Sequence, residues 1–160
     1  MTIKVGDRIP EATFRIMKEG KPTPMTTADL TAGKKVALFG LPGAFTPTCS
    51  AKHLPGFKEK VAEFRAKGVD AIACVSVNDA FVMAAWGKDQ KVGDDILMLA
   101  DGNGEFAKAV GLEMDGTGFG MGKRIQRFSM VIDNGVVKSL NVEEPGKFEV
   151  SSAEYMLGQL

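Results

Sequence analysis

The chain has 160 residues, 44% of them hydrophobic, and its twenty basic side chains balance its twenty acidic ones. This length predicts one domain, residues 1–160, with a sizeable core, and the neutral balance argues against nucleic acid or an anionic membrane as a partner. No apolar run is long enough to span a membrane and two cysteines make no disulfide framework, so we expect a soluble cytoplasmic protein with reduced thiols.

The first regular pattern predicts a short strand and a short helix. Hydrophobicity alternates over residues 13–17, which is typical of a strand, and the turn-forming residues 19–22 end it. Thr26 or Thr27 can cap a single helical turn that Gly33 closes. We expect the strand to be peripheral and the helical turn to be a connector.

The stretch that carries chemistry begins with a predicted buried strand. Residues 35–41 are almost continuously apolar, as in strands covered on both faces of a parallel sheet. Pro47 suits the first position of the following helix because its missing N–H would be unpaired there, so Thr46 is the expected N-cap. Cys49 then falls in the first helical turn, and we expect the Thr46 hydroxyl to contact its amide and side chain.

Cys49 is therefore predicted to be a nucleophile. The unpaired amides and positive pole of a helix start favour a thiolate over a thiol. Most cysteines are small buried hydrophobic residues, and Cys74, in the middle of another apolar run, is expected to be one of them. The prolines and threonines around Cys49 instead predict an exposed helix entrance.

The helix that starts at Pro47 meets a second proline well inside its length. We expect a kink or a break at Pro55-Gly56, because proline removes a backbone hydrogen bond and clashes with the preceding turn. Beyond it, residues 57–67 have apolar side chains on one face and charged side chains on the others, so an amphipathic helix ending at Gly68 is predicted.

Strands and helices alternate through the middle of the chain. Residues 71–77 and 96–100 are apolar runs typical of buried strands, and helices are predicted over 79–87 and about 104–110. Such alternation indicates an α/β fold with a central sheet whose functional sites lie at the carboxyl ends of the strands. Cys49 follows one of these ends.

The remaining residues predict a loop, a hairpin and a terminal helix. Residues 112–122 are expected to be a surface loop, because their glycine spacing matches neither a dinucleotide fingerprint nor a phosphate-binding loop. Residues 127–132 and 136–142 flank an Asn-Gly turn, which is typical of an antiparallel hairpin. The capping-box pattern of residues 151–154 predicts a short helix after them.

The hairpin also supplies a candidate partner for the thiol. If its first strand runs antiparallel to the strand ending at Leu41, Arg127 lies at the same edge of the sheet as Cys49. A guanidinium there can hold a thiolate and also bind a polar oxygen substrate. Lys123 and Arg124 are the competing cations, of which Arg124 is the alternative to Arg127.

The single histidine is predicted to be structural. His53 lies one helical turn past Cys49, which suggests a Cys–His pair, but no third residue is visible to orient the ring. We therefore expect a packed or capping histidine. A zinc site made of Cys49, His53 and Cys74 is not favoured, because the spacing matches no ligand motif and Cys74 lies in a buried strand.

Several segments together resemble the active site of peroxiredoxins. The pattern Pro42-x-x-x-Thr46-x-x-Cys49 and the later Arg127 match that family, and further segments are similar to its type-II, or fifth-type, subfamily. These segments are residues 40–49, 53–57, 76–79 and 127–130. The resemblance covers essentially the whole chain. It implies a thioredoxin-like fold, with a central mixed β-sheet flanked by helices and an N-terminal strand extension, and reduction of hydrogen peroxide and organic hydroperoxides.

The resemblance also implies roles for individual residues. Cys49 would be the peroxidatic cysteine that becomes a sulfenic acid, Thr46 would contact thiolate and peroxide, Arg127 would be the electrostatic partner, and Pro42 would shield the pocket. Backbone amides near the peroxide would stabilise the breaking O–O bond, and they belong to Gly43, Thr48 and Cys49. No metal, flavin or haem cofactor is implied.

The second half of the catalytic cycle depends on departures from the family pattern. Residues 150–152, where some relatives carry a resolving cysteine, contain none. Cys74 matches the second cysteine of plant-like members, but its position in mid-strand favours a structural role over resolution. The family then implies an external reductant, glutathione or glutaredoxin with thioredoxin also possible, supplied by a separate molecule, and a homodimer.

Two other functions remain open at this point. Cys49 could act in a peroxide sensor or redox relay that passes its oxidation to a partner protein. Alternatively, the chain could be a noncatalytic binding module with a thioredoxin fold.

Overall fold

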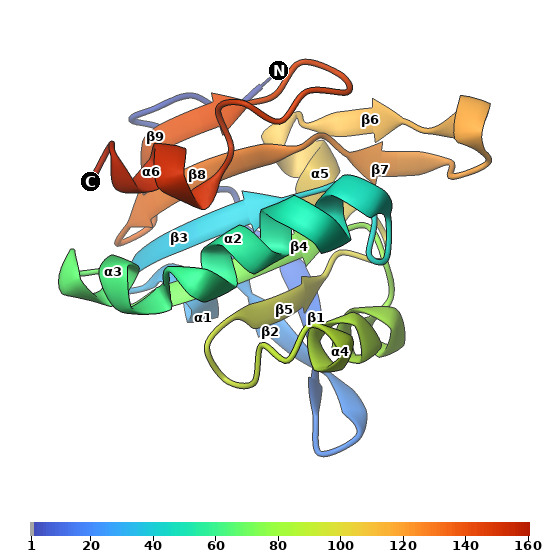
Figure 1. Cartoon of the computed structure of the whole chain (residues 1–160), viewed down its shortest axis with the longest axis horizontal. Helices are drawn as coiled ribbons and strands as arrows, with labels where there is room; N and C mark the ends of the chain where they lie inside the picture. The colour runs from blue at the N-terminus through green and yellow to red at the C-terminus, as the bar shows by residue number, and fades with distance from the viewer. Residues whose placement is uncertain (1) are drawn as a thin grey trace.

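The computed structural model describes residues 2–160. The chain folds around a seven-stranded mixed sheet (Figure 1). The strands lie in the order β2-β1-β5-β4-β3-β8-β9. β3 pairs in parallel with β4 and antiparallel with β8, which confirms the predicted arrangement of the strands before Cys49 and after Arg127. The strands of this sheet are β1 (Thr13–Lys18), β2 (Lys21–Thr26), β3 (Lys35–Gly40), β4 (Ala71–Ser76), β5 (Leu97–Ala100), β8 (Phe128–Asp133) and β9 (Val136–Val142).

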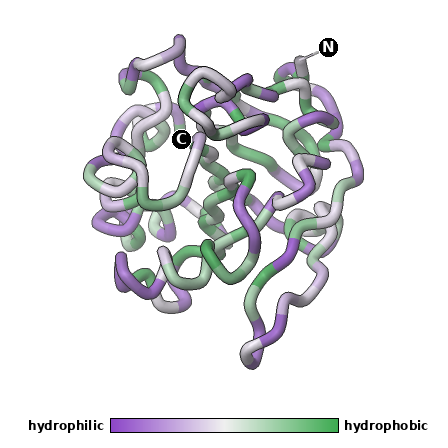
Figure 2. Tube along the Cα trace, turned by 90° about the vertical axis from the view of Figure 1, so that its right-hand side faces the viewer, coloured by the Kyte–Doolittle hydropathy of each residue, from purple (hydrophilic) through white to green (hydrophobic). Residues whose placement is uncertain are grey.

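Helices cover both faces of the sheet, and each face has its own hydrophobic core. One core packs against α2 (Leu54–Glu59), α3 (Val61–Ala66), α4 (Ala80–Asp89) and α6 (Ala153–Leu157). The other packs against α1 (Thr27–Thr31) and α5 (Glu105–Val110). Successive residues of β3 and β4 alternate between these cores, as the period of two in a strand requires. In Figure 2 the apolar segments accordingly gather in the interior. None of the helices in residues 2–160 is both long and apolar enough to cross a bilayer.

The N-terminal hairpin contains a strand that the sequence did not indicate. β2 pairs antiparallel with β1 although it contains Pro22 and Pro24. Both prolines fit because β2 is the edge strand, where a missing backbone N–H removes no hydrogen bond from a central ladder.

The expectation of a loop over residues 112–122 is wrong in part. β6 (Glu113–Asp115) pairs antiparallel with β7 (Lys123–Ile125), and a 3-10 turn, η2 (Thr117–Phe119), lies between them. The two strands form a small separate sheet with mostly exposed or half-buried side chains, so they lack the apolar alternation by which strands are recognised.

Of the kink or break expected at Pro55-Gly56, the break does not occur. Residues Cys49–His53 form a π-helical turn, η1, and the helix continues from it through Pro55 into α2. The wider turn gives the proline ring room and leaves its missing N–H without consequence at the start of α2. The chain breaks at Lys60 instead, where φ is −109° and ψ is 15°.

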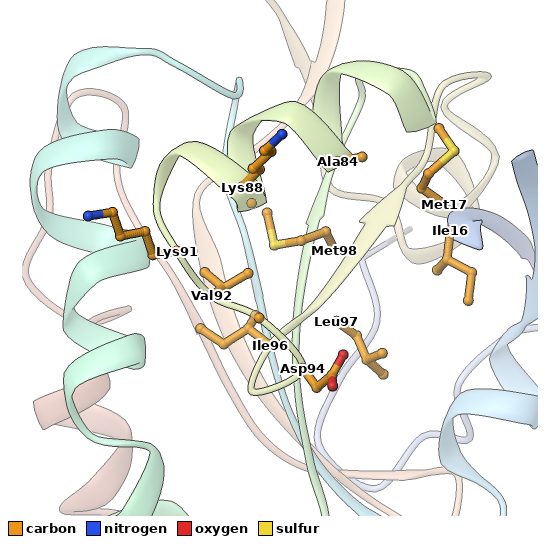
Figure 3. Close-up of a pocket in the computed structure, with 12 residues that line it drawn as sticks. Ile16, Met17, Ala84, Lys88, Lys91, Val92, Asp94, Ile96, Leu97 and Met98 are labelled. Carbon is orange, nitrogen blue, oxygen red and sulfur yellow. The ribbon is translucent and has the colours of Figure 1, made fainter. Parts of the chain in front are cut away.

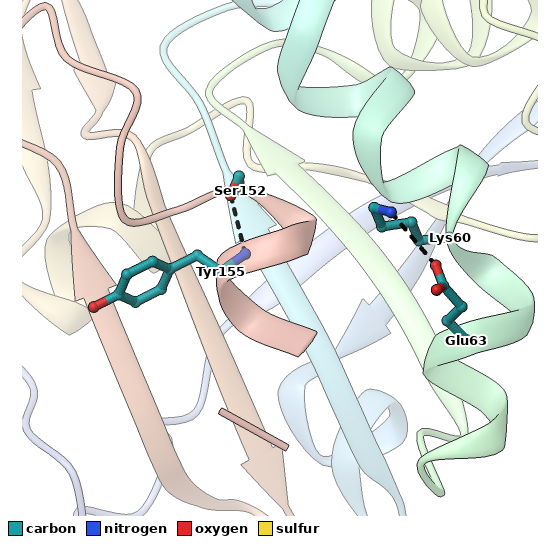
Figure 4. A network of polar contacts seen from close by, with 4 residues as sticks. All are labelled: Lys60, Glu63, Ser152 and Tyr155. Atoms are coloured by element: carbon teal, nitrogen blue, oxygen red, sulfur yellow. Dashed lines mark hydrogen bonds and ion pairs between the residues drawn. The ribbon is translucent and has the colours of Figure 1, made fainter. Parts of the chain in front are cut away.

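The terminal helix begins one residue later than the capping-box pattern indicates. Ser152 is the N-cap of α6, and its hydroxyl accepts a hydrogen bond from the Tyr155 amide (Figure 4). Figure 4 also shows the Lys60–Glu63 ion pair at the start of α3, an i,i+3 contact of 3.5 Å. Ser151, predicted to belong to the cap, is instead buried against a different partner, Glu143.

Gly40 at the end of β3 permits close packing just before the active-site segment. A Cβ there would clash with the ring of Phe128, which faces Gly40 across the β3–β8 ladder. We therefore expect Gly40→Ala to lower the free energy of unfolding by about 1–3 kcal/mol, as overpacked core positions do. Gly118→Ala is the matched control, because a Cβ there meets nothing within 4 Å, and a change within about 0.5 kcal/mol is expected. Urea unfolding measures both, and equal stabilities of the two variants would contradict this packing.

Candidate active site

Cys49 lies at the start of η1, above the carboxyl end of β3, and its side chain is fully buried. Phe45 and Pro47 at the helix entrance are exposed, as expected, but the expectation that Cys49 shares this exposure is wrong. Cys49 belongs to the core between the sheet and α2, α3, α4 and α6.

A tight turn between β3 and the helix positions Thr46. The Thr46 hydroxyl donates a 2.7 Å hydrogen bond to the Gly43 carbonyl, and Phe45 within the turn has φ of 64°. The prediction that this hydroxyl caps the Cys49 amide is wrong, because the turn brings the Gly43 carbonyl within its reach instead. Its oxygen lone pairs remain able to accept a hydrogen bond.

The amides at the helix start can serve an incoming oxygen. In residues 2–160, the first hydrogen bond into the helix runs from the Ser50 amide to the Thr46 carbonyl at 2.9 Å. The amides of Thr48 and Cys49 precede that bond, as the first amides of a helix do. Gly43 is buried in the turn before the helix, and a Cβ on it would approach Thr46 Cγ2 and Arg124 Nη1 to 3.1 Å. The missing side chain therefore allows Thr46 and Arg124 to pack closely against the turn.

Arg127 reaches the thiol as predicted from the strand order. It precedes β8, whose first residue Phe128 is paired with Gly40 at the end of β3. Its Nη2 donates a hydrogen bond to Cys49 Sγ at 3.1 Å. The alternative cation, Arg124, donates instead to the carbonyl of Pro42 at 3.1 Å, so it holds the turn. The Arg127 guanidinium thus places a permanent positive charge beside the sulfur.

His53 is packed, as expected, but it also holds Arg127. Its Nδ1 lies 2.9 Å from Arg127 Nη1, and its Nε2 lies 2.9 Å from the Ser151 carbonyl oxygen. A guanidinium only donates and a carbonyl only accepts, so Nε2 carries the hydrogen and Nδ1 is the acceptor. Burial, and then the charge of Arg127, lower the pKa of His53 from 6.5 to about 3. The ring is neutral at physiological pH and orients the guanidinium.

Cys74 lies in the middle of β4, as predicted, and is fully buried in the same core as Cys49. Both cysteines are free thiols. Burial, and then the neighbouring Cys49, raise the pKa of the Cys74 thiol well above its ordinary value. Cys74 is therefore a poor nucleophile in this fold.

Neither a metal-binding cluster nor the cavity formed by β1, α4 and β5 involves this site in the part of the chain that the structure describes. In residues 2–160, no group of three or more His, Cys, Asp or Glu side chains is arranged to hold an ion. A cavity of about 680 Å³ is lined by apolar side chains of β5 and β1 and by the end of α4, with Met98, Ile96 and Val92 around its centre (Figure 3). Neither Cys49 nor Arg127 lines this cavity, so it is separate from the site around the thiol.

Comparisons with known proteins agree on one family. A family model described as Redoxin matches residues 4–157. Peroxiredoxin-2E-2, chloroplastic, of Oryza sativa subsp. japonica is 56% identical over 164 residues, which cover 99% of this chain and 73% of the rice protein. Hybrid peroxiredoxin hyPrx5 of Haemophilus influenzae is 45% identical over 163 residues, covering 100% of this chain and 67% of that protein. The chain belongs to the peroxiredoxin family.

A solved structure shows that the similarity includes the three-dimensional fold. The crystal structure of reduced Prx3 from Vibrio vulnificus in complex with H₂O₂ has a TM-score of 0.95 and 54% sequence identity, and the match covers 99% of each chain. The predicted thioredoxin-like fold with a mixed central sheet is confirmed. The protein is a type-II peroxiredoxin, a thiol-dependent peroxidase with an antioxidant function, which sets aside the noncatalytic binding module.

Two features of this peroxiredoxin site could not be predicted from the sequence. The contact between His53 and Arg127 joins residues far apart in the chain, and the ring is oriented by a backbone carbonyl, which no residue type reveals. The spacing of Cys49 and His53 on successive helical turns is the only sequence signal for this contact, and it suggests a direct Cys–His pair instead of two residues that share one arginine.

The buried neutral His53 makes the stability of the peroxiredoxin depend on pH. In the unfolded chain His53 takes up a proton near pH 6.5, whereas in the folded chain it does so only near pH 3. Stability is therefore fully present above about pH 6.5 and is lost as pH falls toward 3. We expect the unfolding free energy to fall between pH 6.5 and 5 by at most about 1.4 kcal/mol per pH unit. Denaturant titrations at several pH values measure this slope.

The chain has one histidine, so a variant isolates its contribution. His53→Asn removes the titrating group, and the difference in unfolding free energy between wild type and this variant should shrink as the pH falls. A difference that stays constant from pH 7.5 to pH 5 would show that His53 is protonated equally in both states.

Proposed function

We propose that Cys49 is the peroxidatic nucleophile of this peroxidase and that Arg127, Thr46 and the amides at the helix start form its peroxide site. The observation that carries this proposal is the 3.1 Å hydrogen bond from Arg127 Nη2 to Cys49 Sγ. It joins a permanent cation to a thiol at a helix start, the surroundings in which cysteines react as thiolates.

In the first step, the thiolate sulfur gives an electron pair to one oxygen of the peroxide. An S–O bond forms, the O–O bond breaks, and the leaving oxygen takes a proton to become water or an alcohol, so Cys49 is oxidised to a sulfenic acid and the peroxide is reduced. Arg127 and the amides of Thr48 and Cys49 stabilise the negative charge that moves onto the oxygens. The Thr46 hydroxyl donates its hydrogen to the Gly43 carbonyl, so its oxygen accepts a hydrogen bond from the peroxide O–H and orients the attack.

In the second step, an external thiol resolves the sulfenic acid. Its sulfur attacks Cys49, a mixed disulfide forms, and the sulfenic oxygen leaves as water. A second thiol then exchanges with the mixed disulfide and restores the Cys49 thiol. Because the Cys49 side chain is fully buried, we favour glutathione as the first thiol, followed by glutaredoxin, over direct attack by thioredoxin. The high pKa and burial of Cys74 support its structural role.

Assembly and location complete the proposal. We propose a homodimer formed through the loops around the site, where the exposed aromatic side chains of Phe45 and Phe119 lie. A reducing compartment such as the cytoplasm suits a protein whose two cysteines are both free. In the alternative function, a redox relay, oxidised Cys49 would pass its state to a partner protein instead of glutathione.

Substitution of each cysteine separates these roles. Cys49→Ser should abolish peroxide reduction, because serine cannot form the sulfenic acid, whereas Cys74→Ser should retain most of the activity. Intact-protein mass after one equivalent of peroxide measures the outcome directly. Wild type should gain one oxygen atom without glutathione and one glutathionyl group with it.

Other outcomes of this experiment identify other mechanisms. A loss of two hydrogen atoms, absent in Cys74→Ser, would indicate an internal disulfide and contradict resolution by an external thiol. Fast oxidation of Cys49 together with poor turnover by glutathione and glutaredoxin would favour the redox relay.

Removal of the cation should slow the first step. Arg127→Gln keeps hydrogen-bond donors near the sulfur but removes the charge, and we expect the rate constant for Cys49 oxidation to fall roughly 100-fold, as when one donor to a developing anion is lost. Stopped-flow fluorescence with hydrogen peroxide measures it. Arg65→Gln is the matched control, since Arg65 forms only an exposed 3.3 Å ion pair with Asp95. Equal rate constants for the two variants would refute the role of Arg127.

A further inference from the structure

The segment between β9 and α6 is fastened by one buried carboxylate. Glu143 directly follows β9, and its Oε2 accepts hydrogen bonds from the amides of Glu149, Val150 and Ser151 at 2.7, 2.8 and 2.8 Å. The Ser151 hydroxyl donates a fourth bond to the same oxygen at 2.7 Å. We call residues 149–151 the latch segment. One anionic oxygen therefore determines where this segment lies.

The latch segment leads directly to the reactive sulfur. The Ser151 carbonyl accepts from His53 Nε2, and His53 Nδ1 accepts from Arg127 Nη1, while Arg127 Nη2 donates to Cys49 Sγ. The Glu143 amide also donates to the Arg127 carbonyl at 2.9 Å. The hydrogen bonds thus form a closed ring. The Glu143 amide holds the Arg127 backbone, and the Glu143 carboxylate holds the Arg127 guanidinium through Ser151 and His53.

Phe148, the residue directly before the latch segment, packs against both His53 and Arg127. The Phe148 ring lies edge-on to the His53 ring, with centroids 5.1 Å apart, and the Arg127 guanidinium carbon lies 5.9 Å from the Phe148 centroid. A shift of the latch segment would therefore move the acceptor of His53 and the aromatic face beside Arg127 together.

We propose that Glu143 is a positioning residue for peroxide reduction, which acts through the Ser151 carbonyl and His53 to hold the Arg127 guanidinium on Cys49. The inference rests on the roles proposed above for Cys49 and Arg127. Glu143 touches neither substrate nor sulfur. Its effect is to select the His53 tautomer with hydrogen on Nε2, which leaves Nδ1 free to accept from Arg127.

The position requires a carboxylate. Burial alone raises the pKa of Glu143, but the hydrogen bonds from Ser151, Val150 and Glu149 outweigh burial and lower it below its ordinary value. The side chain is therefore ionised at neutral pH, and bonds to an ionised acceptor are about twice as strong as neutral ones. An amide of the same shape could replace the oxygen but would offer weaker bonds to four donors.

Glu143→Gln tests the proposal, with Glu144→Gln as its control. Glu144 is the next residue and forms only an exposed 3.2 Å ion pair with Lys147. We expect Glu143→Gln to lower the rate constant for Cys49 oxidation by about tenfold, less than the 100-fold that a 1 Å misplacement can cause. Glu144→Gln should react at the wild-type rate. Stopped-flow oxidation by hydrogen peroxide measures all three proteins, and equal rates for both variants would overturn the proposal.

A double-variant comparison distinguishes positioning from general loosening of the fold. If Glu143 acts only through Arg127, adding Glu143→Gln to Arg127→Gln should not slow oxidation further. If the two substitutions instead multiply their effects, Glu143 acts by another route and the proposal fails. A melting temperature lowered equally in both backgrounds would not alter this result, because it reports the fold and not the position of the guanidinium.

The single histidine provides a spectroscopic reading of the same ring. The imidazole ¹⁵N shifts of His53 in wild type should show hydrogen on Nε2, and Glu143→Gln should move the two shifts toward each other as the tautomers mix. Unchanged shifts in this variant would overturn the proposal.

Should Glu143→Gln fail to fold, Ser151→Ala removes one of the four bonds and keeps the carbonyl that His53 needs. It should slow oxidation roughly twofold to threefold, in proportion to one lost bond, and a wild-type rate would count against the proposal.

If wild type itself showed no oxidation of Cys49, the proposed function would fail. If only the Glu143 and Ser151 variants matched wild type, this inference alone would fail.

Discussion

The hydrogen bond between the Arg127 guanidinium and the Cys49 sulfur is the contact on which the site depends. A thiol buried in an apolar core normally stays protonated, because desolvation opposes its charge. Cys74 shows that outcome in the same core, where burial raises its pKa. The difference between the two cysteines is the permanent positive charge at 3.1 Å and the helix start on which Cys49 lies. These two features support the proposal that Cys49, and not Cys74, is the reactive thiol.

A guanidinium near a core must itself be held by acceptors, and the fold supplies them from distant parts of the chain. Arg127 enters from the start of β8, His53 comes from the turn after Cys49, and Ser151 lies before α6. The neutral His53 ring suits this place because its Nδ1 accepts a hydrogen bond, whereas a protonated ring would set two positive charges against each other. The lowered pKa of His53 and its contact with Arg127 are thus two results of one arrangement.

The π-helical turn at Cys49–His53 links local chain geometry to this network. Its wider spacing places Cys49 and His53 at the two ends of one turn, and both residues contact the same guanidinium. The turn also lets the helix pass through Pro55 without a break. Such π turns in α-helices are often found at functional sites. Here the geometry of the turn allows one arginine to bridge sulfur and imidazole.

The sequence alone determined the elements and chemistry that arise from neighbouring residues. The buried strands, the reactive-cysteine motif and the Asn-Gly hairpin depend on local pattern, and the strand order that follows from them brings Arg127 beside Cys49. It did not reveal β2, because the prolines of that edge strand are tolerated only through its place in the sheet.

The tertiary structure alone decided the burial of Cys49, the acceptor of the Thr46 hydroxyl and the ring that joins Glu143 to Arg127. These features depend on which backbone carbonyls and which distant side chains meet. Backbone carbonyls are the same in every residue, so their positions become known only when the chain is folded.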